Sequence, residues 1–141
     1  MTPKDGLERL IYLELRGLRE QVVGLHGSMV ATSDGFMVAN DMPGLEPSRI
    51  AALIATTLGL ARQATQATGR GSFRESVTRG SDGYLAVFAA GERAVIAVLG
   101  APDMNVGMLH YQIRDLIRRI VHHLDGAVQG RPGFYTPDGG A

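Results

Sequence analysis

Histidine, serine and aspartate are the side chains in this sequence that could do chemistry, and the histidines raise the question of a metal site. The four histidines are His26, His110, His122 and His123. His122 and His123 are adjacent, so on a helix they point about 100° apart and cannot face one ion. The sequence has no cysteine and no His-Glu-x-x-His motif, and it therefore shows no zinc-binding pattern. A solvated helix end is the better interpretation of this pair.

His26 and Ser28 are a candidate base and nucleophile, because residues two apart in a strand lie on the same face. No Gly-x-Ser-x-Gly motif surrounds this serine, and such a pair is more often an ordinary strand surface. The stretch Gly69-Arg70-Gly71 lacks the third glycine of a dinucleotide-binding loop, and the sequence has no Gly-Lys-Ser or Gly-Lys-Thr of a P-loop. We therefore predict no catalytic residue, no cofactor and no enzymatic activity.

Three arginines could contact nucleic acid, because Arg114, Arg118 and Arg119 share one helical surface. Asp115 stands among them, and the formal net charge of the chain is zero. Aromatic residues, which would supply stacking platforms for bases, make up 6% of the chain. The pattern is that of a solvated helix face, and we predict no nucleic-acid partner.

Asp34 could be an acid at the mouth of a pocket or only the bend of a hairpin. It is followed by Gly35, and the same dipeptide returns as Asp82 and Gly83. Both copies stand between a polar stretch and an apolar run, where Asp-Gly is a strong hairpin signal. We interpret all four residues as turn residues and not as chemistry.

Hydrophobic periodicity predicts the elements that position these residues. Asp5 and Glu8 form the capping box of a first helix, and Asp103 is the expected N-cap of the last one. The predicted order is helix, two strands, helix, three strands, helix, over residues 5–20, 22–32, 36–39, 46–68, 72–79, 84–90, 93–99 and 103–124. A two-residue turn, Gly91-Glu92, joins the last two strands. This order predicts an α+β fold with one five-stranded, largely antiparallel sheet.

Composition and length indicate one folded domain. Of 141 residues, 45% are hydrophobic and 20% are charged, as in ordinary globular chains. We assign residues 1–125 to a single domain and expect the Gly- and Pro-rich residues 126–141 to be a disordered tail. No stretch resembles a signal peptide or a membrane span, so we expect a cytoplasmic protein that does not insert into a membrane.

The helix over residues 46–68 has two different faces. We place the core on the side formed by Ile50, Leu53, Ile54, Thr57, Leu60, Ala61 and Ala64. The opposite side has no Lys or Glu and consists of small or uncharged residues, namely Ala52, Ala55, Thr56, Gly59, Gln63 and Gln66. Gly59 costs about 0.8–1 kcal/mol relative to alanine inside a helix, which favours close packing against another backbone. The alternative is that alanine is simply a good surface helix former.

Residues 72–79 alternate as an edge strand would. Phe73, Glu75, Val77 and Arg79 form one expected face, and the residues between them form the other. Both later strands are apolar on each face, so we expect them to be central in the sheet and covered from two sides.

Six segments, taken in order, resemble a roadblock/dynein light chain domain, in particular the small prokaryotic members. They are Val23-Gly24-Leu25, Ser33-Asp34-Gly35-Phe36, Ile50-Ala51-Ala52-Leu53, Gly83-Tyr84-Leu85-Ala86-Val87, Ala97-Val98-Leu99 and Asn105-Val106-Gly107. The passage over residues 97–103 is similar to accessory proteins encoded beside Ras-like GTPases in actinobacterial conserved operons. The resemblance spans roughly residues 6–124 and does not include the tail from Gly126 onward.

The resemblance implies a sheet with helices on both faces and a homodimer. The middle helix would pack against its twin, and the following strand would pair edge to edge. This assigns the dimer interface to Ala52, Ala55, Thr56, Gly59, Gln63, Gln66, Phe73, Glu75 and Val77.

The functional implication of the resemblance is binding and regulation of a small Ras-like GTPase, or an adaptor role, without an arginine finger. A sensor kinase-like or other operon-encoded protein is a further partner to expect. The alternative is a sensory module that holds a small ligand between sheet and helix, which a buried polar cluster around His26, Tyr84 or Asn105 would favour.

Overall fold

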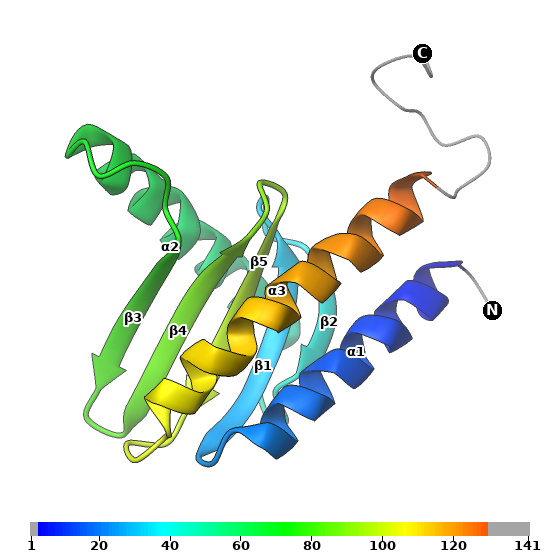
Figure 1. The fold of residues 1–141 in the computed structure, drawn as a ribbon, viewed down its shortest axis with the longest axis horizontal. Coiled ribbons are helices and arrows are strands. Elements are labelled where there is room, and N and C mark those ends of the chain that lie inside the picture. The colour runs from blue at the N-terminus through cyan, green and yellow to red at the C-terminus, as the bar shows by residue number, and fades with distance from the viewer. Residues whose placement is uncertain (1–2, 130–141) are drawn as a thin grey trace.

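The computed structural model describes residues 3–129 and has the predicted order of elements (Figure 1). These are α1 (Pro3–Gln21), β1 (Leu25–Thr32), β2 (Met37–Asp41), α2 (Pro47–Ala67), β3 (Glu75–Gly80), β4 (Gly83–Ala90), β5 (Ala94–Gly100) and α3 (Val106–Gln129). The strands form one antiparallel sheet in the order β2-β1-β5-β4-β3. The predicted α+β class and element order are therefore confirmed.

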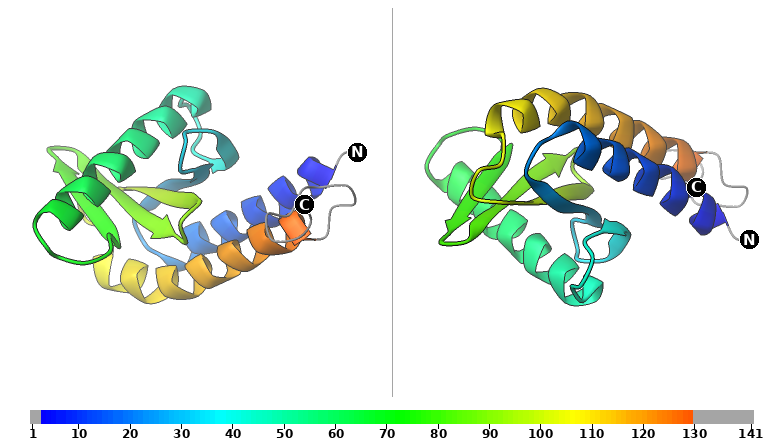
Figure 2. Two further views of the ribbon diagram at one scale, coloured as in Figure 1. Left: turned by 90° about the horizontal axis from the view of Figure 1, so that it is seen from above. Right: turned by 90° about the horizontal axis from the view of Figure 1, so that it is seen from below.

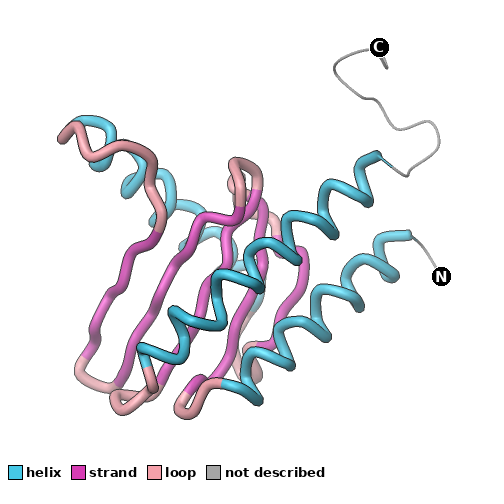
Figure 3. The backbone as a smooth tube through the Cα atoms, in the orientation of Figure 1, coloured by secondary structure: helices cyan, strands magenta, loops and turns pink. Residues whose placement is uncertain are grey.

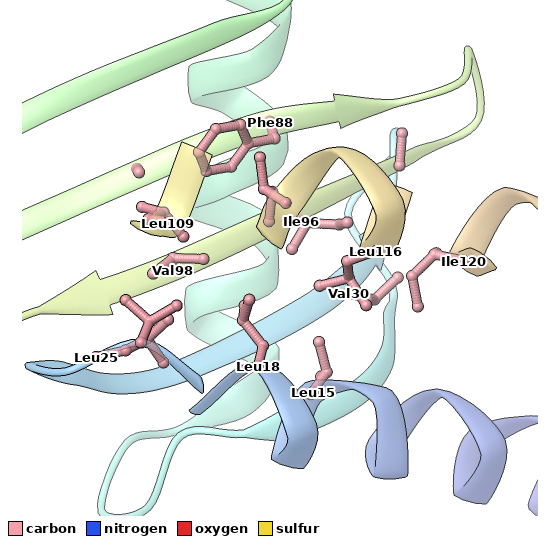
Figure 4. Packing of buried hydrophobic residues seen from close by; sticks show 14 of the residues in the cluster. Leu15, Leu18, Leu25, Val30, Phe88, Ile96, Val98, Leu109, Leu116 and Ile120 are labelled. Carbon is pink, nitrogen blue, oxygen red and sulfur yellow. The ribbon is translucent and has the colours of Figure 1, made fainter. Parts of the chain in front are cut away.

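The helices cover both faces of the sheet, as the resemblance implied. Figure 2 shows α1 and α3 side by side on one face and α2 alone on the other. The two-helix layer encloses the larger core, in which Leu15 and Leu18 of α1 and Leu116 and Ile120 of α3 converge on the sheet (Figure 4). These residues repeat at helical spacing, so each helix turns one continuous apolar stripe toward the strands.

The centre of the sheet is β5, which lies between β1 and β4. Its residues Val95, Ile96, Ala97 and Val98 are fully buried, because α1 and α3 cover one face of this strand and α2 covers the other. Alternate residues enter the two opposite cores: Ile96 and Val98 pack on the α1–α3 side, and Val95 and Ala97 pack on the α2 side. The apolar character of both faces of this strand thus follows from its central position.

Several predicted boundaries are wrong, because local contacts move them. The first helix begins at Pro3, so Asp5 lies within it and cannot be its N-cap. The last helix begins at Val106: the Met108 amide donates to Asn105 Oδ1 at 3.0 Å, so Asn105 and not Asp103 is the cap. This helix also continues through Gly126 to Gln129, so the predictions that it ends at residue 124 and that a disordered tail begins at Gly126 are wrong. The expected tail beyond that point, residues 130–141, lies outside the described residues.

The turns at the two ends of the sheet are short (Figure 3). The β4–β5 connection is one residue longer than predicted, since Ala90 pairs with Ala94 across Gly91, Glu92 and Arg93. The first strand begins at Leu25 and not at Val22, because the chain turns at Gly24, whose φ is +86°. A side chain at Gly24 would lie 2.7 Å from Met104 Cα, so this turn depends on glycine both for its backbone angle and for its close approach.

Candidate functional site

The strand β3 forms an open edge of the sheet. It pairs with β4 alone, and the helices pack mainly on the other four strands (Figure 1). All of its residues except Ser76 are exposed, and Val77 is 49% exposed. An exposed strand edge of this kind is a template for pairing with another strand. The opposite edge strand, β2, lies against α1 instead.

The backbone groups that β3 offers to a partner can be identified from its register. The Ala89 amide donates to Arg74 O at 3.0 Å, so Arg74 and every second residue after it direct their backbone groups toward β4. Glu75, Val77 and Arg79 therefore direct their N–H and C=O groups away from β4. These are the groups that remain available at the open edge.

The side chains of the predicted interface strand do not share one face. Glu75 pairs with Phe88 and Val77 with Ala86, and both partners belong to the core on the α1–α3 side. Phe73 instead packs on the α2 side. The predicted alternation from Phe73 is wrong because the regular strand begins only at Glu75.

The core face predicted for α2 is also partly wrong. The residues buried against the sheet are Ala51, Ile54 and Leu58, whereas Leu53 is 53% exposed and Leu60 is 63% exposed. The helix carries two apolar stripes on different sides, and the stripe with the small Ala51 lets the helix axis approach the sheet closely. Leu53 and Leu60 consequently join the outward face.

We call this outward surface the α2 face and define it by Ala52, Leu53, Thr56, Gly59, Leu60 and Gln63, all of which are exposed. Thr56 donates its hydroxyl to Ala52 O at 2.9 Å within the helix, so this polar group is already satisfied. The guanidinium group of Arg62 is directed away from this face and donates to Gly91 O and Glu92 O. These six residues are therefore uncharged and largely apolar, with Gly59 open to close approach, and the exposed Arg49 lies one helical turn before Ala52 and Leu53.

Two residues predicted on this interface lie differently. Ala55 is half-buried because the β1–β2 turn rests on the helix: a side chain at Gly35 would meet Ala55 Cβ at 3.7 Å. Gln66 is exposed but lies at the far end of the helix, where it lines a cavity with Ser72 and Phe73.

The residues of the two Asp-Gly dipeptides lie in turns, as predicted. Asp34 is exposed in the β1–β2 turn, and Gly35 has a φ of +101°. Asp82 directly precedes Gly83, the first residue of β4.

The fold that carries the open strand edge and the α2 face is that of a known kind of domain. A family model described as the Roadblock/LC7 domain matches residues 11–100. The chain belongs to the Roadblock/LC7 family. It is 26% identical to protein MJ1340 of Methanocaldococcus jannaschii over 98 residues, which are 69% of this chain and 85% of that protein.

Two solved structures share the roadblock fold. A Roadblock/LC7 domain from Streptomyces avermitilis is 24% identical, with a TM-score of 0.75, and the match covers 81% of this chain and 97% of that one. MglB of Myxococcus xanthus is 14% identical, with a TM-score of 0.76 and coverage of 84% and 90%. The region matched by the family model ends with β5, so α3 of this roadblock domain lies beyond it.

In this roadblock domain α3 is tied to α1 by a carboxylate that sequence analysis did not single out. Glu14 accepts from Arg119 Nε at 2.8 Å and lies 3.1 Å from His123 Nε2. Burial alone would raise the pKa of Glu14, but the hydrogen bonds from Arg119 and His123 outweigh it and lower this pKa. His123 thus has a structural role, and over the described part of the chain no three ligand-type side chains gather into a metal site.

The remaining candidates for chemistry in the roadblock domain do not come together. Ser28 is fully buried opposite Asp41, while His26 is exposed, because a bulge between Leu25 and Gly27 breaks their common face. The polar cluster that would favour a sensory module at His26, Tyr84 and Asn105 is not formed, since His26 and Asn105 are exposed and Asn105 caps α3. In residues 3–129 no helix is long and apolar enough to span a bilayer.

Proposed function

We propose that this roadblock domain is a homodimeric, non-enzymatic regulator or adaptor that binds a small Ras-like GTPase in the cytoplasm. The observation that carries the proposal is the combination of an unpaired β3 edge with an uncharged α2 face. Each surface alone would be an aggregation hazard on a monomer. A second copy would remove both at once, by pairing β3 with β3 and packing α2 against α2.

The chemistry of the two surfaces suits a symmetric contact. The outward N–H and C=O groups of Glu75, Val77 and Arg79 are self-complementary in an antiparallel pair. The α2 face supplies apolar area through Leu53 and Leu60, and Gly59 allows the helices to approach closely. A standard interface buries about 1,200–2,000 Å² in total, a size that one strand edge and one helix face per copy can provide together.

The resemblance to the roadblock/dynein light chain family supports the proposal of a GTPase partner. Phosphoryl transfer is accelerated mainly by positioning and electrostatics, so a regulator can act by orienting its partner's own groups. In this proposal the dimer supplies a rigid surface and no reacting residue. A sensor kinase-like or other operon-encoded protein would bind as a further partner of the same assembly.

The experiment is calorimetric binding of the full-length protein to the Ras-like GTPase encoded nearest its gene, in its GDP state and with a GTP analogue. Binding that depends on the nucleotide would support a regulator, because a ligand shifts a switch only by its differential affinity for the two states. Equal binding to both states would support an adaptor. No binding to either state would overturn the GTPase proposal and leave the dimer to be judged by its own tests.

A further inference from the structure

A cavity of about 470 Å³ opens between the start of β3 and the first half of α3. Phe88 and Ile113, both buried, and the half-buried Ile117 line its apolar part. The cavity lies on the α1–α3 side of the sheet, opposite the α2 face, because Phe88 belongs to the core beneath α1 and α3. Its volume is within the range of small-molecule sites, which is roughly 300–1,000 Å³.

Two arginines stand at the rim of this cavity. Arg74 precedes β3, Arg114 lies on α3, and both are exposed and line the cavity. Neither forms an ion pair with another residue of the described chain. The neighbouring Arg118, by contrast, is paired with Asp115. Guanidinium groups are always charged and bind planar anions in a bidentate manner, so the rim provides positive charge that the protein itself does not neutralise.

The one carboxylate that lines the cavity is already neutralised. Glu75 Oε2 lies 2.6 Å from His110 Nε2, and His110 Nδ1 lies 3.0 Å from Val106 O. Both ring nitrogens therefore face oxygen atoms, an arrangement that suits the doubly protonated imidazolium as donor to both. While His110 is protonated, Glu75 and His110 form a neutral pair, and the cavity then carries the two positive charges of Arg74 and Arg114 above an apolar wall.

From this arrangement we propose that the cavity binds a small organic anion, a carboxylate or phosphate attached to a flat or branched apolar body. The anionic group would bridge Arg74 and Arg114, and the apolar body would lie against Phe88, Ile113 and Ile117. Such a ligand would connect the loop before β3 to α3. The proposal depends neither on dimerisation nor on a GTPase, since a single copy supplies every residue of the site.

The test uses phenyl phosphate as the probe, with inorganic phosphate and phenol as its two halves. Binding to the full-length protein is measured by calorimetry and by 15N–1H chemical shifts. We expect saturable one-to-one binding of phenyl phosphate, at least about tenfold tighter than binding of either half. The amide shifts should be concentrated in residues 72–75 and 110–117.

The variants are Arg74→Gln and Arg114→Gln, and the matched control is Arg118→Gln on the same helix outside the cavity. Each of the first two should weaken binding about tenfold or more, as expected for loss of a hydrogen bond to a charged group, while the control binds as the wild type does. All three positions are exposed, so folding should be preserved. The proposal is overturned if phenyl phosphate does not bind, if inorganic phosphate binds equally well, or if Arg118→Gln weakens binding as much as the other two.

Discussion

Glu75 Oε2 on β3 and His110 Nε2 on α3 lie 2.6 Å apart, although 35 residues separate them in the chain. This hydrogen-bonded pair connects the open edge strand β3 directly to α3. The hydrogen bond to Glu75 raises the pKa of His110 above its usual 6.5, against the opposing effects of burial and of the Arg114 charge. The strength of this tie must therefore depend on pH.

Glu75→Gln should remove that pH dependence. Because the folded-state pKa of His110 is raised, its contribution to stability is fully present below about pH 6.5 and is lost as the pH rises through the folded-state value. We expect the wild type to lose no more than about 1 kcal/mol over this range, since both side chains are about 40% exposed and screened by solvent. Urea unfolding at a series of pH values measures this loss. Glu92→Gln, an exposed glutamate nearby, is the control, and an unchanged pH slope in Glu75→Gln would contradict the assignment.

If the protein forms the proposed dimer, Leu53→Glu and Leu60→Glu should each convert it to a monomer. A buried charge without a partner at a helix–helix contact costs several kcal/mol, so the dimer dissociation constant should rise at least about a hundredfold. Leu13→Glu is a matched control, because Leu13 on α1 is 51% exposed, compared with 53% for Leu53. Analytical ultracentrifugation gives the oligomeric state. A dimer that survives both α2 substitutions would exclude the α2 face from the contact.

Val77→Pro should prevent β3 from pairing with a second copy without preventing the fold of the single chain. The N–H of Val77 points away from β4, so proline removes a group that the monomer does not use but that a paired strand would need. We expect loss of the proposed dimer with a change of less than about 1 kcal/mol in monomer stability. Thr78→Pro is the contrasting variant, because its N–H points toward β4 and its loss should destabilise the fold itself. Equal loss of stability in both variants would mean that the orientation of the strand is different.

Gly24→Ala should be much more destabilising than Gly44→Ala. The two glycines have nearly the same φ, +86° and +84°, so the backbone strain of alanine is similar and costs about 1–2 kcal/mol in each. Only Gly24 has a neighbour in the way, with Met104 Cα 2.7 Å from the position of the added methyl group, whereas Gly44 faces open space. Thermal melting should show an additional loss of about 1–3 kcal/mol for Gly24→Ala. Equal losses would show that the contact between the turn before β1 and the loop before α3 can relax.

Sequence alone predicted the type and order of all eight elements, the antiparallel sheet and the positions of the Asp-Gly turns. These features depend on local properties: hydrophobic period, turn chemistry and chain length between elements. The errors that sequence analysis made at the ends of elements have local causes as well. Asn105, and not Asp103, caps α3, and Gly126 is accommodated inside this helix.

Only the tertiary structure decided which surface of α2 is buried. The helix carries one stripe with Ala51, Ile54 and Leu58 and another with Leu53 and Leu60, and periodicity cannot distinguish two apolar stripes on one helix. The choice depends on how closely the helix packs on β1 and β5, a property of the assembled layers. For the same reason no pattern pointed to the pairing of Glu75 with His110, or to the common cavity of Arg74 and Arg114. Contacts between residues far apart in the chain exist only once the layers have packed.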